Sequence, residues 1–206
     1  MKDNSKQDFL GTWRTGYIEN WEVYEHNSGV KEQEIVDRCL KPFYNKEHTV
    51  LEIGCGGGFW TNKYLAPNFK EVIALDLLSN VQFKQDNIKY IELPDRDYSC
   101  HGVVDDSIDF CWSFGVFCHL TVEACQTYAK SIYSKLHPGS KAVLYYANND
   151  RRPHDPDRLI KPGEVIWAFN DLPTTINLLT AAGFVDIQDL MPNLFDTIIV
   201  CTKPKA

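Results

Sequence analysis

The sequence predicts an α/β fold built on a doubly wound, mostly parallel sheet. Three observations support this prediction. Strand-like apolar runs alternate with helix-like segments along most of the 206 residues. The first run ends in a glycine-rich turn at 54–58, where a helix then begins. The run at 108–114 is almost continuously apolar, as expected for a strand covered on both faces.

Two helices are predicted ahead of the first strand. Tyr17, Trp21 and Tyr24 recur at helical spacing and form one aromatic stripe. This stripe is either a lid over a ligand or the face of a helix packed on the sheet. The second helix is predicted at about 31–43, with its apolar positions from Ile35 to Leu40 turned inward.

Seven strands are predicted from apolar runs between turn signals, at 49–53, 71–75, 88–92, 108–114, 142–146, 185–190 and 197–201. Helices are predicted at 60–65 and, as a short stretch, around Val81. A longer helix begins at Thr121, which can cap it, and is stopped by His137-Pro138-Gly139. The last helix, at 173–182, follows Asp171 and ends at Gly183.

Composition and charge exclude several classes of protein. The formal charge of −7 and the lack of a basic run disfavour binding to nucleic acid. We expect no membrane partner, because no apolar run is long enough for a transmembrane helix and the start has no signal-peptide core. The seven cysteines form no C-x-x-C pair, which indicates reduced thiols in a cytoplasmic protein and predicts no metal site.

The turn after the first strand has the features of a nucleotide site. Gly54, Gly56 and Gly58 follow the strand, and Asp76 ends the next strand about twenty residues later. Dinucleotide sites have a third glycine where this chain has Phe59, which argues against a nicotinamide-dependent dehydrogenase.

The pattern E-x-G-x-G-x-G from Glu52 to Gly58 closely resembles the first motif of the class I S-adenosylmethionine-dependent methyltransferases. Leu136-His137-Pro138-Gly139-Ser140 is similar to their L-x-P-G-G turn, with Ser140 in place of the second glycine. The matches cover about half of the chain, 50–146, and the A-A-G-F at 181–184 fits the same fold. The resemblance implies a Rossmann-like sheet with helices on both faces, an antiparallel last strand and S-adenosyl-L-methionine as cofactor.

The length of 206 residues predicts a single domain over 1–206. Its expected parts are an N-terminal helical cap (1–45), a cofactor-binding half (46–146), a lid or acceptor insertion (147–170) and a C-terminal helix with a strand pair (171–206). The insertion is polar and interrupted by prolines, as long functional loops often are.

The family's cofactor residues map onto four strand ends. The resemblance places Asp76 on the ribose hydroxyls and Leu77 beside the adenine. An acid after the third strand is expected to receive the adenine amino group, and counting back from Asp109 gives Asp97, with Asp95 as the alternative. The predicted cofactor residues are Glu52, Gly54, Cys55, Gly56, Asp76, Leu77, Asp97 and Phe114.

His119 is the candidate general base, since a histidine lying just after the fourth strand can accept a proton near neutral pH. The alternative is a structural histidine between strand and helix. Tyr145 and Tyr146 point to opposite sides of their strand, so only one can face the acceptor. The predicted acceptor residues are Trp21, Phe117, Tyr146, Asn148 and Arg151.

The expected reaction is methyl transfer to a small molecule, at a hydroxyl because the 147–170 segment is polar. The alternatives are N-methylation of a small amine or a protein side chain, and a non-catalytic binding module that keeps the cofactor fold. DNA is excluded as acceptor by the acidic charge and by the lack of N/D-P-P-Y/W and Pro-Cys motifs. The sequence does not define the oligomeric state.

Overall fold

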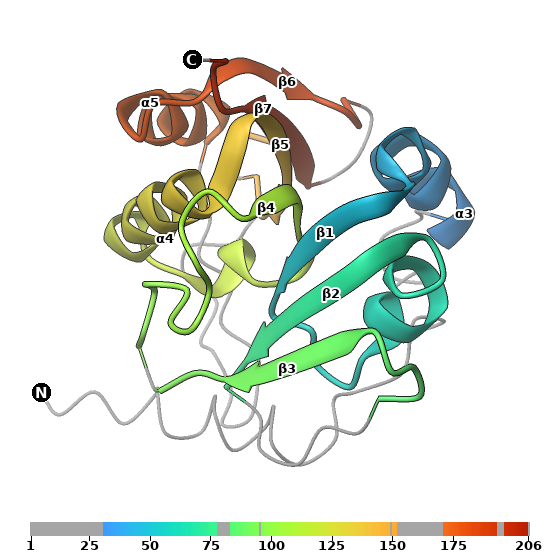
Figure 1. The fold of residues 1–206 in the computed structure, drawn as a ribbon. Helices are drawn as coiled ribbons and strands as arrows, with labels where there is room; N and C mark the ends of the chain where they lie inside the picture. Colours follow the sequence, from blue (N-terminus) through green and yellow to red (C-terminus); the bar gives the residue numbers. More distant parts are fainter. Residues whose placement is uncertain are drawn as a thin grey trace, which may run out of the picture.

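The computed structural model describes residues 31–77, 83–94, 96–148, 150–151, 171–192 and 196–205. Within these residues the chain forms a seven-stranded sheet in the order β3-β2-β1-β4-β5-β7-β6 (Figure 1). The strands are β1 (Asn45–Ile53), β2 (Phe69–Asp76), β3 (Ile88–Glu92), β4 (Ile108–Ser113), β5 (Leu136–Tyr146), β6 (Val185–Asp189) and β7 (Thr197–Thr202).

The strand directions confirm the predicted fold class. The pairs β1–β2, β1–β4, β2–β3 and β4–β5 are parallel. The last strand, β7, runs antiparallel to both of its neighbours, β5 and β6. The chain therefore reverses its order between β1 and β4, at the centre of the sheet.

Helical segments cover both faces of the sheet (Figure 1). One face carries α3 (Glu32–Ile35), η1 (Val36–Leu40), η2 (Lys41–Phe43) and η3 (Thr61–Leu65), and the other carries α4 (Val122–Lys135) and α5 (Leu172–Ala181). A short turn of 3-10 helix, η4 (Phe117–His119), joins the end of β4 to α4. The continuous helical run from 32 to 43 confirms the helix predicted there.

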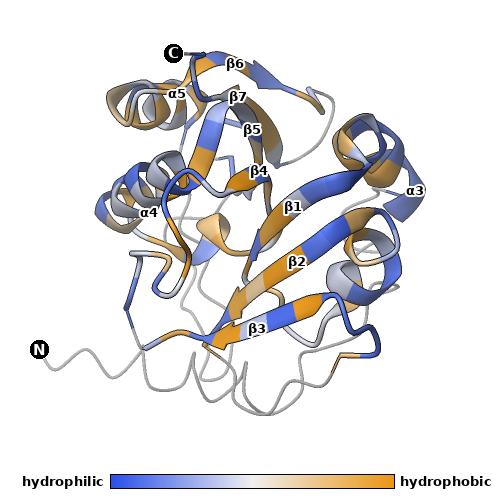
Figure 2. Cartoon of the chain, in the orientation of Figure 1, coloured by the Kyte–Doolittle hydropathy of each residue, from blue (hydrophilic) through white to orange (hydrophobic). Residues whose placement is uncertain are grey.

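Two hydrophobic cores follow from the alternation of side chains along the strands. Leu51 and Ile53 face α4 and α5, whereas Val50 packs with the η1 and η3 side. Figure 2 shows β1 to be hydrophilic in its first half and mostly hydrophobic in its second, whereas in β2 a short hydrophilic stretch near the start is followed by a mostly hydrophobic one. The carboxyl ends of the central strands are thus firmly held by buried side chains.

The helix caps agree with the sequence. The Thr121 side chain accepts a hydrogen bond from the Ala124 amide, and Asp171 accepts one from the Thr174 amide. Gly183 has φ +104, and a Cβ there would lie 2.9 Å from the Tyr133 ring. Only glycine fits this position without strain.

Several predicted strand boundaries were wrong. The helix from Thr121 ends at Lys135, and His137-Pro138-Gly139 belongs to a longer β5. The terminal strand explains this extension, because the Gly139 amide donates to Lys203 O (2.8 Å) and the Lys203 amide donates to Ser140 O (2.9 Å). β1 also begins four residues early, at Asn45 rather than Thr49, and β4 ends at Ser113, before Phe114.

Lys203 ties the end of β7 to the start of β5. Its ammonium donates to Leu136 O at 2.7 Å and to Asp106 Oδ1 at 2.6 Å. It also lies 4.9 Å from the centre of the Tyr133 ring. The lysine therefore joins α4, β5 and β7 at the amino edge of β5.

The predicted aromatic stripe of Tyr17, Trp21 and Tyr24 and the helix near Val81 lie outside the described residues. Within the described ranges, no helix is both long enough and apolar enough to cross a membrane.

Candidate active site

The carboxyl ends of β1 and β4 lie side by side at the point where strand order reverses. In open α/β sheets, ligands bind outside the carboxyl ends of the strands at such a point. We call this border of the sheet the carboxyl edge. It carries the glycine turn after β1, Asp76 at the end of β2, and the segment 114–119 after β4.

The glycine turn is held against β2 by its own backbone. The Gly54 and Cys55 amides both donate to Leu75 O, at 2.8 and 3.2 Å. The Gly58 amide closes the turn on Cys55 O at 2.9 Å. Gly54 has φ +74, and a Cβ on it would come within 2.0 Å of Val116 Cγ2. Glycine is thus required at 54 by both backbone and packing.

Gly56 and Gly115 stand on the two sides of the reversal point and differ from Gly54. Both have positive φ, +53 and +77, and a Cβ on either would meet none of the described atoms within 4 Å. Each glycine therefore leaves room at the carboxyl edge where any side chain would intrude. This room fits a cofactor that approaches the backbone closely.

Asp76 is bonded to the same turn. Its Oδ2 accepts a hydrogen bond from the Gly56 amide at 2.7 Å, while Tyr90 Oη donates to the Asp76 carbonyl at 3.4 Å. Asp76 and the following Leu77 are only partly buried. The hydrogen bond holds the Asp76 carboxylate against the glycine turn.

Glu52 lies beneath this turn, with only 1% of its surface exposed. The Thr61 hydroxyl, which is also fully buried, donates to Glu52 Oε2 at 2.5 Å. Burial raises the pKa of Glu52 to about 8, the Thr61 hydrogen bond opposes this, and Asp76 adds to it. Burial therefore favours the protonated form of the Glu52 carboxyl group.

Asp97 is placed in a local turn, where its Oδ1 accepts from the Ser99 amide at 2.8 Å. This hydrogen-bonding to Ser99 lowers the pKa of Asp97. Burial raises the pKa of the Tyr128 hydroxyl, and nearby Cys100, Asp76 and Asp97 raise it further. Asp76 and Asp97 thus both contribute to the raised pKa of Tyr128. Asp95, the alternative to Asp97, lies outside the described residues.

The end of β4 is rich in aromatic rings. The Phe114 ring lies 4.5 Å from Tyr145, 5.1 Å from Trp60 and 5.9 Å from Trp112, measured between ring centres. His119 follows in η4, partly buried, with its amide bonded to Val116 O at 2.9 Å. The turn thus holds His119 at the carboxyl edge, close in sequence to both Gly115 and Phe114.

Tyr145 and Tyr146 lie on opposite sides of β5, as predicted. Tyr145 packs into the core on the η1 side, and its hydroxyl donates to the buried carboxylate of Asp196. Tyr146 packs on the α5 side. Burial raises the pKa of Tyr146 to about 12, although the nearby hydroxyls of Thr197 and Thr175 oppose this shift.

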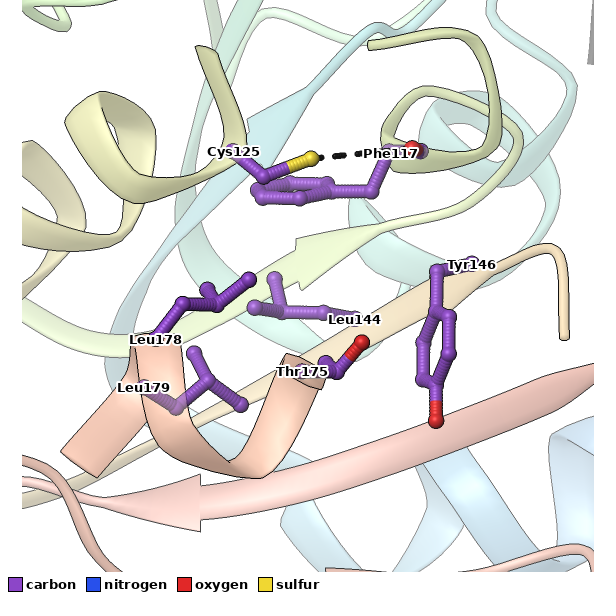
Figure 3. A pocket seen from close by; sticks show the side chains of 7 residues that line it. All are labelled: Phe117, Cys125, Leu144, Tyr146, Thr175, Leu178 and Leu179. Atoms are coloured by element: carbon purple, nitrogen blue, oxygen red, sulfur yellow. Dashed lines mark hydrogen bonds between the residues drawn. The ribbon is translucent and has the colours of Figure 1, made fainter. Parts of the chain in front are cut away.

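Phe117 and Tyr146 share a small apolar cavity of about 10 Å³ between β5, η4 and the helices (Figure 3). Its lining residues are Phe117, Cys125, Leu144, Tyr146, Thr175, Leu178 and Leu179. Cys125 Sγ lies 3.7 Å from the Phe117 carbonyl and donates to it. The cavity has room for a single water molecule, so these two residues form a wall rather than an open acceptor pocket.

Asn148 and Arg151 are both held by the end of the sheet. Asn148 is 1% exposed, and its Nδ2 donates to Thr197 Oγ1 at 2.7 Å. Arg151 donates to the Asp189 carboxylate at 2.5 Å and to Met191 O at 3.4 Å. Trp21, the remaining predicted acceptor residue, lies outside the described residues.

Hydrogen bonds therefore join Gly56 to Asp76 and hold Gly54 and Cys55 against β2. Glu52 bonds to Thr61, and Asp97 bonds within its own turn. Sequence reasoning did not identify Thr61 or Asp196. Thr61 could have been predicted from the sequence, because a hydroxyl on the inner side of the first helix after the turn can reach back to β1. Asp196 could not have been predicted, because its position depends on the register of β7 against β5.

Two further features of the described residues bear on the site. No three His, Cys, Asp or Glu side chains gather there as metal ligands would. A hollow of about 440 Å³ opens between the starts of β1, β4 and β5, among Phe43, His48, Asp109 and Lys141. It lies at the opposite border of the sheet from the glycine turn and takes no part in the site.

Comparison with known proteins agrees with this geometry. Residues 24–189 match the family model described as a methyltransferase domain. No curated protein matches the chain significantly. Among solved structures, a Mesorhizobium loti S-adenosylmethionine-dependent methyltransferase is 16% identical, covering 80% of this chain and 94% of its own, with a TM-score of 0.61.

Two similar structures contain ligands. The Burkholderia thailandensis 1,6-didemethyltoxoflavin-N1-methyltransferase, with 1,6-didemethyltoxoflavin and S-adenosylhomocysteine, is 19% identical with a TM-score of 0.66, covering 98% of this chain and 88% of its own. A Haemonchus contortus N-methyltransferase with phosphomonomethylethanolamine and S-adenosylhomocysteine is 15% identical with a TM-score of 0.68, covering 98% of this chain and 59% of its own. At these identities the likeness concerns the fold.

Proposed function

Because the chain belongs to the methyltransferase domain family and is an S-adenosylmethionine-dependent methyltransferase, we propose that it methylates a hydroxyl group of a small molecule. The open space over Gly56 and Gly115, on the two sides of the reversal point, supports the carboxyl edge as the cofactor site. The observation that favours a hydroxyl is the position of His119 on η4, beside this space in the chain.

The residues of the carboxyl edge suit the cofactor. S-adenosylmethionine supplies a methyl group already activated on a sulfonium. Asp76, which accepts a hydrogen bond from the Gly56 amide, would accept hydrogen bonds from the ribose hydroxyls, and Leu77 would contact the adenine. Gly54 and Cys55 hold the turn to β2 without using their side chains. The chain's own task is to align the acceptor with the methyl group and to exclude water.

His119 would accept the proton of the acceptor hydroxyl. A histidine is suited to this task because its unperturbed pKa is about 6.5. Its ring is carried by a turn that is anchored to the Val116 carbonyl, so the backbone there is fixed. Phe117 and Tyr146 support this turn from the α4 and α5 side. Asn148 and Arg151 would shape the acceptor site indirectly, because their hydrogen bonds fix the start of the segment after β5.

Calorimetry tests the cofactor assignment. S-adenosylhomocysteine should bind the wild-type protein, and Asp76→Ala should weaken binding by about 1.5–3 kcal/mol, the range for hydrogen bonds involving a charged group. Glu92→Ala is a matched control, because Glu92 is an exposed acid opposite Asp76 at the end of the neighbouring strand. Equal affinities for the two variants would show that Asp76 does not hold the cofactor.

An amine acceptor is the second candidate. The rings of Phe114 and Tyr145 lie close together, and the Asp196 carboxylate is bonded to Tyr145. Aromatic faces and a carboxylate both attract a cation, which suits an amine. Two of the similar structures are named as N-methyltransferases. A panel of hydroxylated and amine acceptors with labelled S-adenosylmethionine decides between the two, since methylated amines without methylated alcohols would overturn the first proposal.

A further inference from the structure

We propose that the hollow at the starts of β1, β4 and β5 is a second ligand site, which binds a small molecule that combines a flat aromatic ring with a carboxylate. The hollow lies at the amino edge of the sheet, the border opposite the glycine turn. A molecule bound there is separate from both the cofactor and the methyl acceptor.

The hollow has the size and the walls of a ligand site. Its volume of about 440 Å³ falls within the range of about 300–1,000 Å³ in which small-molecule pockets lie. Its walls are the junction of η2 and β1 at 42–45, the start of β4 at 109–110 and the first half of β5 at 137–141. Because these walls belong to the central sheet, the hollow is formed before any ligand binds.

A column of stacked aromatic rings ends at the hollow. The rings of Phe69 and Phe110 are stacked with their centres 5.7 Å apart, and the ring of Phe43 stacks on Phe110 at 4.7 Å. Phe69 and Phe110 are buried, whereas Phe43 is partly exposed and lines the hollow. A flat ring in the hollow can therefore contact Phe43 and extend the column, which is a favourable arrangement for aromatic rings.

The charged side chains of the hollow favour an anion. Lys141 and Lys205 both line it, and Asp109 is the one acid among the described lining residues. Asp109 Oδ2 already accepts a hydrogen bond from the Thr49 amide at 2.8 Å. Lys141 Nζ donates to Thr202 Oγ1 at 2.7 Å, which leaves further N–H groups of this ammonium for a ligand.

His48 adds a hydrogen-bond donor. The Glu47 amide donates to Asn45 Oδ1 at 2.9 Å, so the other end of the Asn45 side chain, Nδ2, is a donor. Asn45 Nδ2 lies 2.9 Å from His48 Nε2, which accepts this hydrogen bond, so the ring hydrogen of His48 is on Nδ1. Since His48 lines the hollow, its Nδ1–H group is available to a bound carboxylate.

The single acid selects between anions. Asp109 repels a bound anion, and this repulsion grows with the charge of the anion. A carboxylate carries one negative charge, whereas a phosphate monoester carries nearly two at neutral pH. The lining therefore suits a carboxylate better than a phosphate, and the ring of the ligand would lie against Phe43.

Naphthoate is the probe for this site. It is titrated into the full chain, and amide NMR follows Gly139 and Ser140 at the hollow and Gly54 and Gly56 at the carboxyl edge. We expect the Gly139 and Ser140 signals to shift with a Kd of about 1 mM or tighter, while the Gly54 and Gly56 signals stay in place. Saturation with S-adenosylhomocysteine should leave this Kd unchanged.

Two relatives of the probe test the charge of the ligand. Naphthamide has the same ring system without a charge, and naphthylmethylammonium has the opposite charge. Both should bind at least about tenfold more weakly than naphthoate, because neither accepts charge-assisted hydrogen bonds from the lysines.

Substitutions test the walls. Lys141→Met should raise the Kd for naphthoate about tenfold, and Lys205→Met, at an exposed position, about two- to fivefold. Phe43→Leu should raise it about two- to tenfold by removing the ring contact. Lys70→Met is the matched control, since Lys70 is exposed near the start of β2 and is not among the described residues that line the hollow. Urea denaturation shows whether each variant is folded.

Four results would overturn the proposal. The first is that naphthoate leaves the Gly139 and Ser140 signals in place. The second is equal binding of naphthoate and naphthamide. The third is displacement of naphthoate by S-adenosylhomocysteine, which would assign the probe to the carboxyl edge. The fourth is an equal Kd in Lys141→Met, Lys205→Met and Lys70→Met. None of these results bears on the methyl transfer, because the cofactor site is tested by its own ligand.

Discussion

Gly54 and Val116 lie so close together that a Cβ on Gly54 would stand 2.0 Å from Val116 Cγ2. The contact joins the turn after β1 to the segment after β4, across the point where strand order reverses. Any side chain at 54 would push these two segments apart, and both of them border the proposed cofactor site. We therefore expect folding to depend on Gly54 and cofactor binding to depend on Gly56.

Gly54→Ala should destabilise the protein, while Gly56→Ala should mainly impair binding. The first substitution adds a clash to a left-handed backbone, and we expect a loss of about 2–4 kcal/mol in the free energy of unfolding. The second meets open space at φ +53, so its loss should stay near 1–2 kcal/mol. Denaturation in urea measures both.

Calorimetry with S-adenosylhomocysteine completes this comparison. The Cβ of Gly56→Ala would fill room that the cofactor needs, and the Kd should rise at least about tenfold, or 1.4 kcal/mol. If Gly56→Ala binds as the wild type does, the open space over Gly56 is not part of the site.

The stability of the cofactor-free protein should fall as pH rises from about 5 to 8. Burial raises the pKa of Glu52 from 4.5 to about 8 in the folded chain, so over this range the folded state keeps a proton that the unfolded state has lost. The stabilisation is complete below the unfolded pKa and disappears as pH rises through the folded pKa. The total is on the order of 4 kcal/mol.

Glu52→Gln checks this pH dependence. The amide cannot ionise, so urea denaturation should show a nearly flat free energy between about pH 5 and 8. An equal decline in wild type and variant would assign the effect to other groups.

Replacing Lys203 with Met should destabilise the fold by about 1–3 kcal/mol, because the buried carbonyl of Leu136 loses its charged donor. The same change at Lys41 is a matched control. Lys41 pairs with Asp37 one turn away on an exposed helix surface, where such pairs contribute at most about 0.5 kcal/mol. Similar losses in the two variants would contradict the role of Lys203.

Tyr145→Phe and Tyr146→Phe should differ although the residues are adjacent. Losing the Tyr145 hydroxyl leaves the buried Asp196 carboxylate without this donor, and we expect a loss of about 1–3 kcal/mol. The Tyr146 hydroxyl is buried without a hydrogen bond of normal length among the described residues, so its removal should change stability by less than about 0.5 kcal/mol. Thermal denaturation of both variants measures the difference.

His119→Gln should reduce turnover by about 10²–10⁴-fold if His119 accepts the proton of a hydroxyl acceptor. The wild-type rate should also fall as pH drops below the pKa of His119, while cofactor affinity stays unchanged. A variant with reduced thermal stability and an unchanged rate per folded molecule would show that His119 is structural.

The positions of the strands along the chain could be predicted because the relevant signals are local. The apolar run before Gly54 and the acid that ends the next strand both lie within short stretches of sequence, and helix caps such as Thr121 depend on a few neighbouring residues. The boundary at 136–139 was predicted wrongly because β5 is extended by Lys203, about sixty residues away. Proline and glycine in this stretch correctly indicated the end of the helix, but they could not indicate that a strand begins there.

Side-chain roles at the site depended even more on distant contacts. Asn148 and Arg151 were predicted to contact the acceptor, yet the structure bonds them to Thr197 and Asp189 on the terminal strand pair. Tyr146 was preferred over Tyr145 although alternation alone cannot tell which side of β5 faces an acceptor. The choice depends on which helices cover each face, and this is a property of the whole fold.

The direction of β7 has a practical consequence. Because this strand runs opposite to β5, the chain leaves the sheet at the border where the Lys205 side chain lies 3.3 Å from a Cβ built on Gly139. A fluorescent label or a surface linker attached after Lys205 would therefore project away from the glycine turn. Immobilising the protein through that end should leave its reaction side open to ligands in solution, which makes surface-based binding measurements with this chain straightforward to design.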